Sequence, residues 1–495
     1  MSAERDAKNQ TRTQFALLIA LSAAAVATRC YHVAALPLWL DEIYSYQLGK
    51  SGLSNIFLNS LNDPHPPLGY LIQALSNGFG TWRSEWGMRW LSVVVGSGTI
   101  LLFYHLARRK LDAWTAFAAG LLFAFSPFHI FYSQEARSTA LATFAAAVSI
   151  YWLTQITYNP KNRRSWIGFG ITSFVGLYVS YSYALVIAPQ IVALFFVLRQ
   201  WRKTLLLGLA LALCGIPFFY LFFQSIPAVS QQHAATASPL LPAVMGLLGG
   251  EPVRYGFFWG HWAITAVFAT AFLSAFLSRK HLDAIFVYHV LQLALPILLF
   301  WGILIPFFHI SMLLSEAKQF MVVLPSFFML VGYGFQTWRH KFSVPVGNGL
   351  VIVACLAVIS VGLFSLSRYW SQGKSPEGTA VLALREQIQP GDAIVSLHHS
   401  LNAAVSFYLP DATAYTKPRR EADGFVFANS TNVVRVAEPP LVSIPETAIL
   451  QHERLWLLTD SRADSDAAGM LLDRCQIRHE ATYAPFVIRL LKQCS

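Results

Sequence analysis

Charged residues are scarce in this chain. Asp, Glu, Lys and Arg make up 12% of its 495 residues, and only 25 residues are acidic. A soluble domain usually carries about 25% charged residues, so this composition excludes an ordinary soluble protein. The sequence also contains no glycine-rich nucleotide-binding loop, no Cys/His pattern with metal-ligand spacing, no internal repeat and no low-complexity tract. Nothing in it therefore indicates a nucleotide site, a structural zinc site or a repeat architecture.

Apolar residues are abundant instead. They form 55% of the chain, and the mean hydropathy is +0.47. Several apolar runs reach roughly 20 residues, the length that crosses the hydrocarbon core of a bilayer. The pattern predicts a polytopic α-helical membrane protein, not a membrane barrel of alternating strands. We expect eleven spans, near residues 15–35, 88–106, 112–131, 138–157, 166–181, 183–198, 204–223, 261–278, 284–305, 319–336 and 348–366.

Basic residues lie at every second junction between these expected spans. They follow the second, fourth, sixth, eighth and tenth spans, as Arg108–Lys110, Lys161–Arg164, Arg199–Lys203, Arg279–Lys280 and Arg339–Lys341. Because cytoplasmic loops are enriched in Lys and Arg, this alternation predicts a cytoplasmic N-terminus and an uncleaved first span. It also explains the net charge of +11 without a nucleic-acid partner. The segments 36–87, 132–137, 224–260 and 306–318, and the chain after about residue 367, would then face the outside.

The composition changes from about Ser375 onward, where polar residues increase and no span-length apolar run remains. Strands are expected at 392–399, 453–459 and 486–491, and helices near 376–389, 401–409 and 463–474. These elements predict a small α/β domain that is large enough for its own core. The expected domains are therefore a transmembrane domain at 1–370, whose first outer loop covers 36–87, and an α/β domain at 371–495.

Two of the five cysteines lie in this second domain. Cys475 and Cys494 flank a stretch that is predicted to form two strands around Ala484 and Pro485, so the two cysteines would lie opposite each other. An oxidising compartment would permit a disulfide there, and the alternative is two free thiols near the end of the chain. The other three cysteines, Cys30, Cys214 and Cys355, fall in expected spans and are interpreted as packing residues.

Three segments on the expected outer side concentrate polar residues: WLDEIYSY (39–46), NDPHPPLGYLI (62–72) and SPFHIFYSQEARS (126–138). A carboxylate at the edge of the hydrocarbon layer is costly unless it is paired or functional, so Asp41 and Glu42 are predicted site residues. The alternative is that they lie in the first turn of a short interfacial helix, where acidic residues are favourable.

The other polar residues of these segments include both acidic and basic side chains. The double proline after His65 favours an extended backbone that would hold Asp63 and His65 on a stiff segment. Arg137 suits an anion such as phosphate, although a local ion pair with Glu135 is the alternative. Lys318 stands at the outer entry of the tenth span, where it would either bind a lipid phosphate or extend to the interface as a snorkelling lysine.

Five motifs together resemble a known superfamily. LWLDE, DPHPPLGYL, the Arg89-Trp90-Leu91 that opens the second span, FHIFYSQEAR and KQFMVVLP are similar to the GT-C glycosyltransferases. The likeness is to the protein-mannosyltransferase-like branch, glycosyltransferase family 39-like, which includes bacterial lipid A aminoarabinose transferases. It extends over about residues 30 to 335, in the order and spacing of those motifs.

The resemblance implies roles for individual residues. Asp41 would be the general base, with Glu42 beside it as the second catalytic carboxylate. The expected substrate-binding residues are Asp63, His65, Arg89, Gln134, Glu135, Arg137 and Lys318. Relatives often have Arg-Tyr where this chain has Lys318, Gln319 and Phe320. The charge is kept there, but the planar fork that binds phosphate in a bidentate manner is lost.

The resemblance also implies a reaction and a location. The donor would be a polyprenyl-phosphate sugar of the undecaprenyl type, and the acceptor lipid A, another glycolipid, a polysaccharide or a protein. We expect inverting transfer at the periplasmic face of a bacterial inner membrane, with no cofactor and no nucleic-acid partner. A divalent cation held by Asp41 and Glu42 is the alternative to metal-free chemistry. Two rivals are a transporter or flippase, which should show an internal repeat and mid-membrane charges, and a non-catalytic scaffold.

Overall fold

The computed structural model describes residues 2–59, 63, 65–232, 258–278, 283–299, 317–421, 424–428, 443–461 and 466–494. The expected outer segments 224–260 and 306–318 lie mostly outside these residues, as does the end of the expected span 284–305. The chain forms two compact units. The helical unit comprises Met1–Val33, Phe57–Gln73 and Arg89–Ser371, and the sheet unit comprises Ala34–Ile56, Ala74–Met88 and Gln372–Ser495. Two stretches of the first outer loop thus belong to the unit that contains the C-terminal domain.

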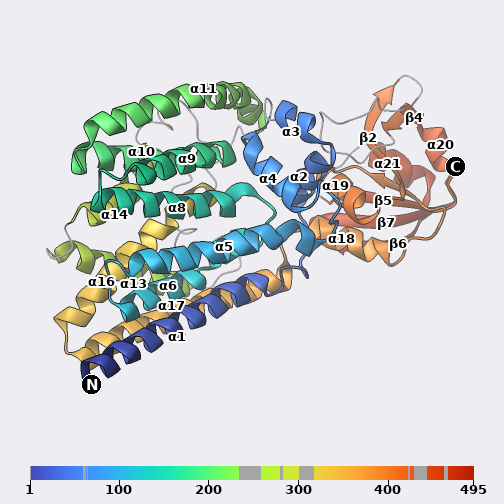
Figure 1. Ribbon diagram of the computed structural model, residues 1–495. Helices are drawn as coiled ribbons and strands as arrows, with labels where there is room; N and C mark the ends of the chain where they lie inside the picture. The colour runs from blue at the N-terminus through green and yellow to red at the C-terminus, as the bar shows by residue number, and fades with distance from the viewer. Residues whose placement is uncertain are drawn as a thin grey trace. The chain divides into compact units, whose positions relative to one another are not determined.

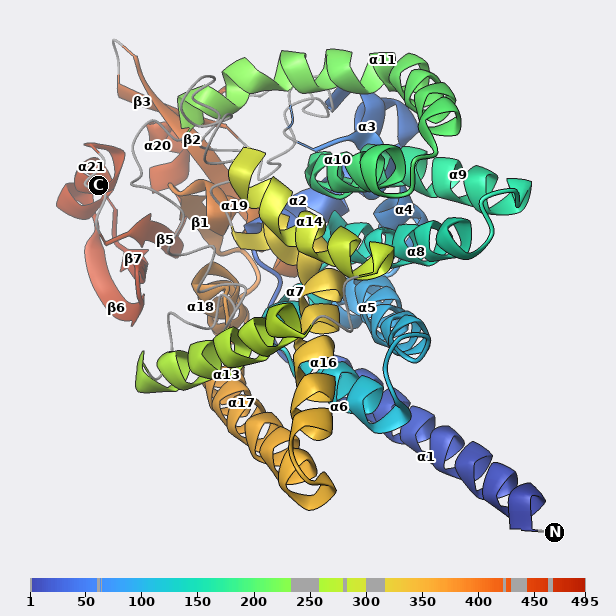
Figure 2. The ribbon, with the colours of Figure 1, turned by 90° about the vertical axis from the view of Figure 1, so that its left-hand side faces the viewer.

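The helical unit is built from long apolar helices (Figure 1). Within it, α8 packs on α9, α10 on α14, and α13 crosses α16 (Figure 2). In chain order its elements are α1 (Ser2–Cys30), α5 (Glu85–Ala107), α6 (Ala113–Ala124), α7 (Pro127–Ser133), α8 (Ser138–Tyr158), α9 (Arg163–Val179), η1 (Tyr181–Tyr183), α10 (Ala184–Val192), η2 (Ala193–Val197), α11 (Trp201–Gln232), α13 (Phe258–Leu277), α14 (Ala284–Leu299), η6 (Ala317–Val323), α16 (Leu324–Lys341) and α17 (Val344–Gln372).

Five helical stretches among the described residues are long and apolar enough to cross a membrane, and a sixth counts if one bent pair forms a single span. The chain is therefore a polytopic α-helical membrane protein, while the predicted total of eleven spans stays a prediction. The five are Thr11–Cys30, Glu85–Ala107, Ser138–Tyr158, Lys318–Lys341 and Val344–Arg385, and shorter apolar helices occur at Tyr181–Val197, Trp262–Leu277 and Ala284–Leu298.

The bent pair corrects the prediction of one continuous helix at 112–131. Helices α6 and α7 meet there at an angle of 57°. The cause is Pro127, which has no N–H to continue the hydrogen bonding of α6 and instead begins α7. The Ser126 side chain accepts a hydrogen bond from the amide of His129 and so caps the new helix. This break places the QEAR motif after a short helix that is buried along its whole length.

The sheet unit contains one mixed sheet with the order β4-β3-β2-β1-β5-β7-β6. Strand β1 runs parallel to β2 and β5, and the remaining pairs are antiparallel. The C-terminal elements are α18 (Pro376–Arg385), β1 (Ala393–Ser396), α19 (His399–Tyr408), β2 (Thr413–Glu421), β3 (Gly424–Ala428), β4 (Ser443–Pro445), α20 (Glu446–Leu450), β5 (Leu455–Asp460), α21 (Asp466–Arg474), β6 (Gln476–Tyr483) and β7 (Phe486–Lys492).

Both faces of this sheet are covered. Strands β1 and β5 are buried throughout except at Asp460, which is typical of parallel strands between two layers of helices. One face packs Val395 and Leu457 against Leu471 of α21. Side chains alternate along a strand, so Ile394 and Trp456 face the other side, where α18 and α19 contact the sheet.

Strands β6 and β7 form the hairpin that the sequence predicted around Ala484 and Pro485. A disulfide joins Cys475, just before β6, to Cys494, just after β7. It closes the hairpin at the end away from the turn. Cys475 packs into the same apolar cluster as Leu491, so the bridge belongs to the core of the unit.

The first outer loop is helical, a feature that the sequence did not indicate in detail. It contains α2 (Leu40–Lys50), α3 (Leu53–Asn59) and α4 (Pro67–Ser76). Helix α2 lies wholly in the sheet unit, whereas the chain passes from one unit to the other within α3, α4 and α5. Helix α2 packs against α19, with the rings of Tyr46 and Phe407 edge to face at 5.0 Å.

Candidate functional site

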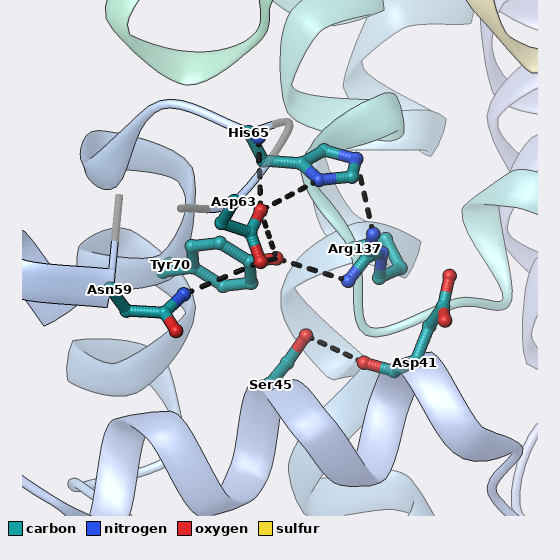
Figure 3. A network of polar contacts seen from close by, with 7 residues as sticks. All are labelled: Asp41, Ser45, Asn59, Asp63, His65, Tyr70 and Arg137. Atoms are coloured by element: carbon teal, nitrogen blue, oxygen red, sulfur yellow. Dashed lines mark hydrogen bonds and ion pairs between the residues drawn. The ribbon is translucent and has the colours of Figure 1, made fainter. Parts of the chain in front are cut away.

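Asp63 is the centre of a buried polar cluster in the helical unit (Figure 3). Its carboxylate accepts hydrogen bonds from the backbone amide of His65 at 2.9 Å and from the Tyr70 hydroxyl at 3.2 Å. It also contacts the His65 ring nitrogen Nδ1 at 3.0 Å and accepts from the Asn59 amide at 3.3 Å. Asp63 is 7% exposed, and this set of donors compensates the cost of burying its charge.

His65 links Asp63 to Arg137. The Arg137 guanidinium donates from Nη2 to Nε2 of His65 at 3.1 Å, so the proton of a neutral ring lies on Nδ1, which faces Asp63. Burial lowers the pKa of His65, and the nearby charges of Arg137 and Lys318 lower it further, although Asp63 acts in the opposite direction. The ring is therefore neutral at neutral pH and connects an anion to a cation without adding charge.

The sequence of this segment explains its shape. Pro67 begins α4 at the position where a missing N–H costs nothing, and Leu68 and Ile72 pack against a core cluster that includes Val179 and Phe320. Gly69 allows a close backbone approach, because a Cβ at this position would lie 2.8 Å from the carbonyl oxygen of Val179. The helix that follows His65 is thus held firmly against the core of the helical unit.

Arg137 stands directly before α8, at its N-cap position, and is 8% exposed. Its guanidinium lies over the Tyr70 ring, 5.8 Å from the centroid, and donates weakly to the Tyr70 hydroxyl at 3.5 Å. Lys318 is the second residue of η6 and is close enough to His65 to affect its charge. The helical unit therefore brings together Asp63, His65 and Arg137, and Lys318 lies close enough to act on the charge of His65.

Gln134 and Arg89 lie elsewhere in this unit, at the end of α1. The Gln134 amide donates to the carbonyl oxygens of Tyr31 at 2.7 Å and Arg29 at 3.0 Å, and Arg89 donates to the carbonyl of Val33 at 2.7 Å. The bond to Arg29 satisfies a carbonyl that the end of α1 leaves without a partner, and the bonds to Tyr31 and Val33 hold the residues that follow the helix. Their geometry favours a role in positioning the chain over direct substrate contact. Glu135 is 1% exposed in the turn between α7 and α8.

Asp41 and Glu42 lie in the first turn of α2, in the sheet unit. Glu42 is fully buried, and its carboxylate accepts a hydrogen bond from the amide of Trp39 at 3.3 Å. It therefore caps the helix, which was the alternative interpretation of this pair. Asp41 is partly exposed, and its backbone carbonyl accepts from the Ser45 hydroxyl at 2.8 Å (Figure 3). Asp41, the predicted base, thus lies in a helix whose first turn is capped by the neighbouring carboxylate of Glu42.

A metal centre has no support in the described part of the chain. Within those residues, no group of three or more His, Cys, Asp and Glu side chains is placed to hold a metal ion.

Sequence reasoning missed several residues of these clusters. Tyr70 and Asn59 complete the shell around Asp63, and Tyr70 carried a signal because it ends the HPPLGY motif. Arg29 and His129 form a second buried pair, with Nη2 and Nδ1 2.6 Å apart. That pair gave no signal, because its members are 100 residues apart in the sequence.

One family model matches part of the helical unit. The family described as dolichyl-phosphate-mannose-protein mannosyltransferase matches residues 64–223, a stretch that contains His65 and Arg137. No curated protein matches the sequence.

Solved structures resemble the chain over nearly its full length. It is similar to ArnT from Cupriavidus metallidurans in the apo state, with a TM-score of 0.60 and 13% identity over 98% of both chains. ArnT bound to undecaprenyl phosphate gives a TM-score of 0.59 at 13% identity, over 95% of this chain and 97% of that one. The apo oligosaccharyltransferase of Archaeoglobus fulgidus gives 0.50 at 12% identity, over 80% and 63%. These matches show that the chain has an ArnT-like GT-C fold.

Proposed function

We propose that this GT-C membrane protein transfers a sugar from a polyprenyl-phosphate donor, of the undecaprenyl-phosphate type, to a lipid, glycan or protein acceptor. The reaction takes place at the periplasmic face of a bacterial inner membrane, with the N-terminus in the cytoplasm. The observation that carries this proposal is the buried cluster in which Asp63 and His65 orient the guanidinium of Arg137. Its residues come from the HPP and QEAR motifs of a chain with an ArnT-like fold.

The chemistry requires a base and a stabilised leaving group. Asp41 takes the proton from the acceptor hydroxyl or amine as the acceptor attacks the anomeric carbon. The bond between that carbon and the phosphate oxygen breaks, and the electron pair leaves with the polyprenyl phosphate. A single displacement of this kind inverts the anomeric centre. The donor is already activated, so no cofactor enters the reaction.

Arg137 and Lys318 stabilise the departing phosphate. The fixed donors of a buried guanidinium are worth more than mobile ones in water, because they need no reorganisation as charge develops. Asp63 and His65 hold Arg137 from one side, and the face of the Tyr70 ring supports it from another. Lys318 adds a point charge. Glu135, Gln134 and Arg89 act around this centre by positioning the chain.

The sheet unit offers a place for the polar part of the acceptor. A pocket of about 900 Å³ there is lined by residues that include Arg83, Arg385, Gln389, Tyr408 and Asp411. Arginine forks, amides and an aromatic face are groups that bind polyhydroxylated or charged head groups. Arg385→Ala should therefore raise the KM for the acceptor and leave kcat unchanged. An unchanged KM would remove the pocket from acceptor binding.

A transporter or flippase of a lipid-linked sugar is the alternative function. Mass spectrometry of lipid, polysaccharide and protein fractions, from cells with and without the gene, separates the two. Glycosyl transfer predicts a fixed hexose, pentose or uronate mass difference in one fraction, which would also name the sugar and the acceptor. Unchanged masses, together with an altered distribution of a lipid-linked sugar between the membrane leaflets, would favour transport.

A further inference from the structure

The start of α2 is held by residues that follow it by more than three hundred positions. The amide of Leu38 donates to the Tyr408 hydroxyl at 2.7 Å across a sequence separation of 370. The amide of Leu40, the first residue of α2, donates to the Glu377 carboxylate at 3.2 Å across a separation of 337. The Ser375 hydroxyl donates to the carbonyl of Leu38 at 2.8 Å. All of these groups belong to the sheet unit.

These contacts satisfy backbone groups that the beginning of a helix leaves unpaired. The first amides of an α-helix have no acceptor within the helix, and a carboxylate is the most favourable one, because it also opposes the helix dipole. Glu42 supplies such a carboxylate to Trp39 from within α2, and Glu377 supplies one to Leu40 from α18. The turn that carries Asp41 is therefore fixed by two side chains, of which one comes from the C-terminal part of the chain.

The fit between α18 and this segment is close. A Cβ at Gly378 would lie 2.7 Å from Cβ of Pro37 and 3.1 Å from the carbonyl oxygen of Leu38. The Tyr408 hydroxyl, which accepts from Leu38, donates in turn to the Glu85 carboxylate at 2.9 Å. Leu38 itself is fully buried. Movement of α18 or α19 would therefore displace the first turn of α2.

We infer that α18 and α19 are positioning elements for the reaction, in which Glu377 and Tyr408 fix the turn that carries Asp41. The inference rests on the proposed function, because it gives Asp41 the role of base. Glu377 also lies close enough to Asp41 for the two charges to interact. The C-terminal domain is, on this account, part of the catalytic apparatus.

The test uses substitutions of Glu377 in the full-length protein, with Glu386→Gln at the exposed end of α18 as the matched control. The probe is undecaprenyl-phosphate mannose, glucose or aminoarabinose in native membrane vesicles, and the readout is release of undecaprenyl phosphate. Glu377→Ala should lower kcat about tenfold or more, because small misplacements of a catalytic group are costly, and should leave the donor KM unchanged. Glu377→Gln keeps an acceptor for Leu40, so it should restore most of kcat.

Hydrogen exchange gives a readout that does not depend on activity. The amides of α2 should exchange faster in Glu377→Ala, Tyr408→Phe and Gly378→Ala than in the wild type, while those of α21 stay unchanged. Wild-type kcat and wild-type exchange in Glu377→Ala would overturn the inference. If Asp41→Asn is inactive in the same assay, that result leaves the proposed function standing. If Asp41→Asn is fully active, Asp41 is not the base, and the inference loses its premise while glycosyl transfer itself stands.

Discussion

The Asp63 cluster of the helical unit and the first turn of α2 in the sheet unit use carboxylates in different ways. Asp63 is enclosed by side-chain and backbone donors, and its function in the structure is to orient His65 and, through it, Arg137. Around Asp41, the neighbouring carboxylates of Glu42 and Glu377 bind backbone amides and fix the helix instead. A buried carboxylate that accepts several hydrogen bonds is suited to organising a site. Asp41 is held in place through the backbone of α2 instead, and in the proposed reaction its side chain accepts a proton.

The largest loss of activity is expected for Asp41→Asn. The amide keeps the size of the side chain but cannot accept the proton, so transfer should fall about 10³-fold. Thermal unfolding of the purified protein should be unchanged, because the backbone of α2 is held by other residues. Asp473→Asn, at an exposed position of α21 in the sheet unit, is the control and should be fully active. Full activity of Asp41→Asn would remove this residue as the base.

Arg137→Ala should cost about 10²-fold in the rate of transfer, the usual loss when one preorganised donor to a developing charge is removed. Arg137→Lys keeps the charge but loses the planar fork, so its rate should lie between those of Arg137→Ala and the wild type. Initial rates of undecaprenyl phosphate release measure both variants. Equal rates for Arg137→Ala and the wild type would contradict a phosphate-binding role.

Asp63→Ala tests whether the carboxylate of Asp63 holds the other side chains of the Asp63 cluster in place. The change leaves buried donors and the Arg137 charge with too few partners, so we expect a loss of about 3 kcal/mol in the free energy of unfolding. The rate of transfer should also fall, through misplacement of Arg137. Chemical denaturation followed by tryptophan fluorescence gives the stability, with Asp473→Ala, at an exposed position of α21, as the control. A variant with wild-type stability and a wild-type rate of transfer would show that Asp63 is not needed to orient His65 and Arg137.

The pH dependence of the cluster follows from His65. Its pKa in the folded protein is lowered by burial and by Arg137 and Lys318, so the folded state binds fewer protons than the unfolded state. This contribution to stability is present above the unfolded pKa of about 6.5 and is lost as the pH falls below it. We therefore expect an acid loss of stability and of transfer that His65→Gln reduces, measured from pH 4 to 8. An identical acid profile in His65→Gln would contradict this assignment.

The smallest effect on activity is expected for the disulfide. The double change Cys475→Ser and Cys494→Ser should cost about 2–3 kcal/mol of stability in the sheet unit and change the transfer rate little. Cys214→Ser, at an exposed free cysteine in α11, is the matched control and should change neither. Limited proteolysis followed by mass spectrometry measures the opening of the β6–β7 hairpin. A wild-type cleavage rate in the double variant would show that the bridge is dispensable.

The sequence predicted the parts of the molecule that depend on local patterns. Apolar runs indicated the long helices, and the turn around Ala484 and Pro485 placed Cys475 opposite Cys494. The HPP and QEAR motifs named most of the cluster around Asp63, because each motif carries its own backbone geometry and charge. The break between α6 and α7 was missed although Pro127 marked it, because the apolar run continues through the proline.

Contacts between distant segments could not be predicted in the same way. Glu377 and Tyr408 have no local feature that distinguishes them from other polar residues, and their partners Leu38 and Leu40 contribute only backbone groups. A hydrogen bond to a backbone group does not depend on which side chain that residue carries, so the sequence does not reveal it. Strands β2, β3 and β4 were also missed, since the sequence around them has no long apolar alternation.

The most direct test of glycosyl transfer is a reconstitution. The purified protein is placed in liposomes with an undecaprenyl-phosphate sugar and an acceptor fraction from the same membranes, and the lipids are followed by mass spectrometry. The account predicts that undecaprenyl phosphate appears together with an acceptor heavier by one sugar, and that both are missing with Asp41→Asn. A folded wild-type protein that leaves every donor intact, while moving it from one leaflet to the other, would contradict the account.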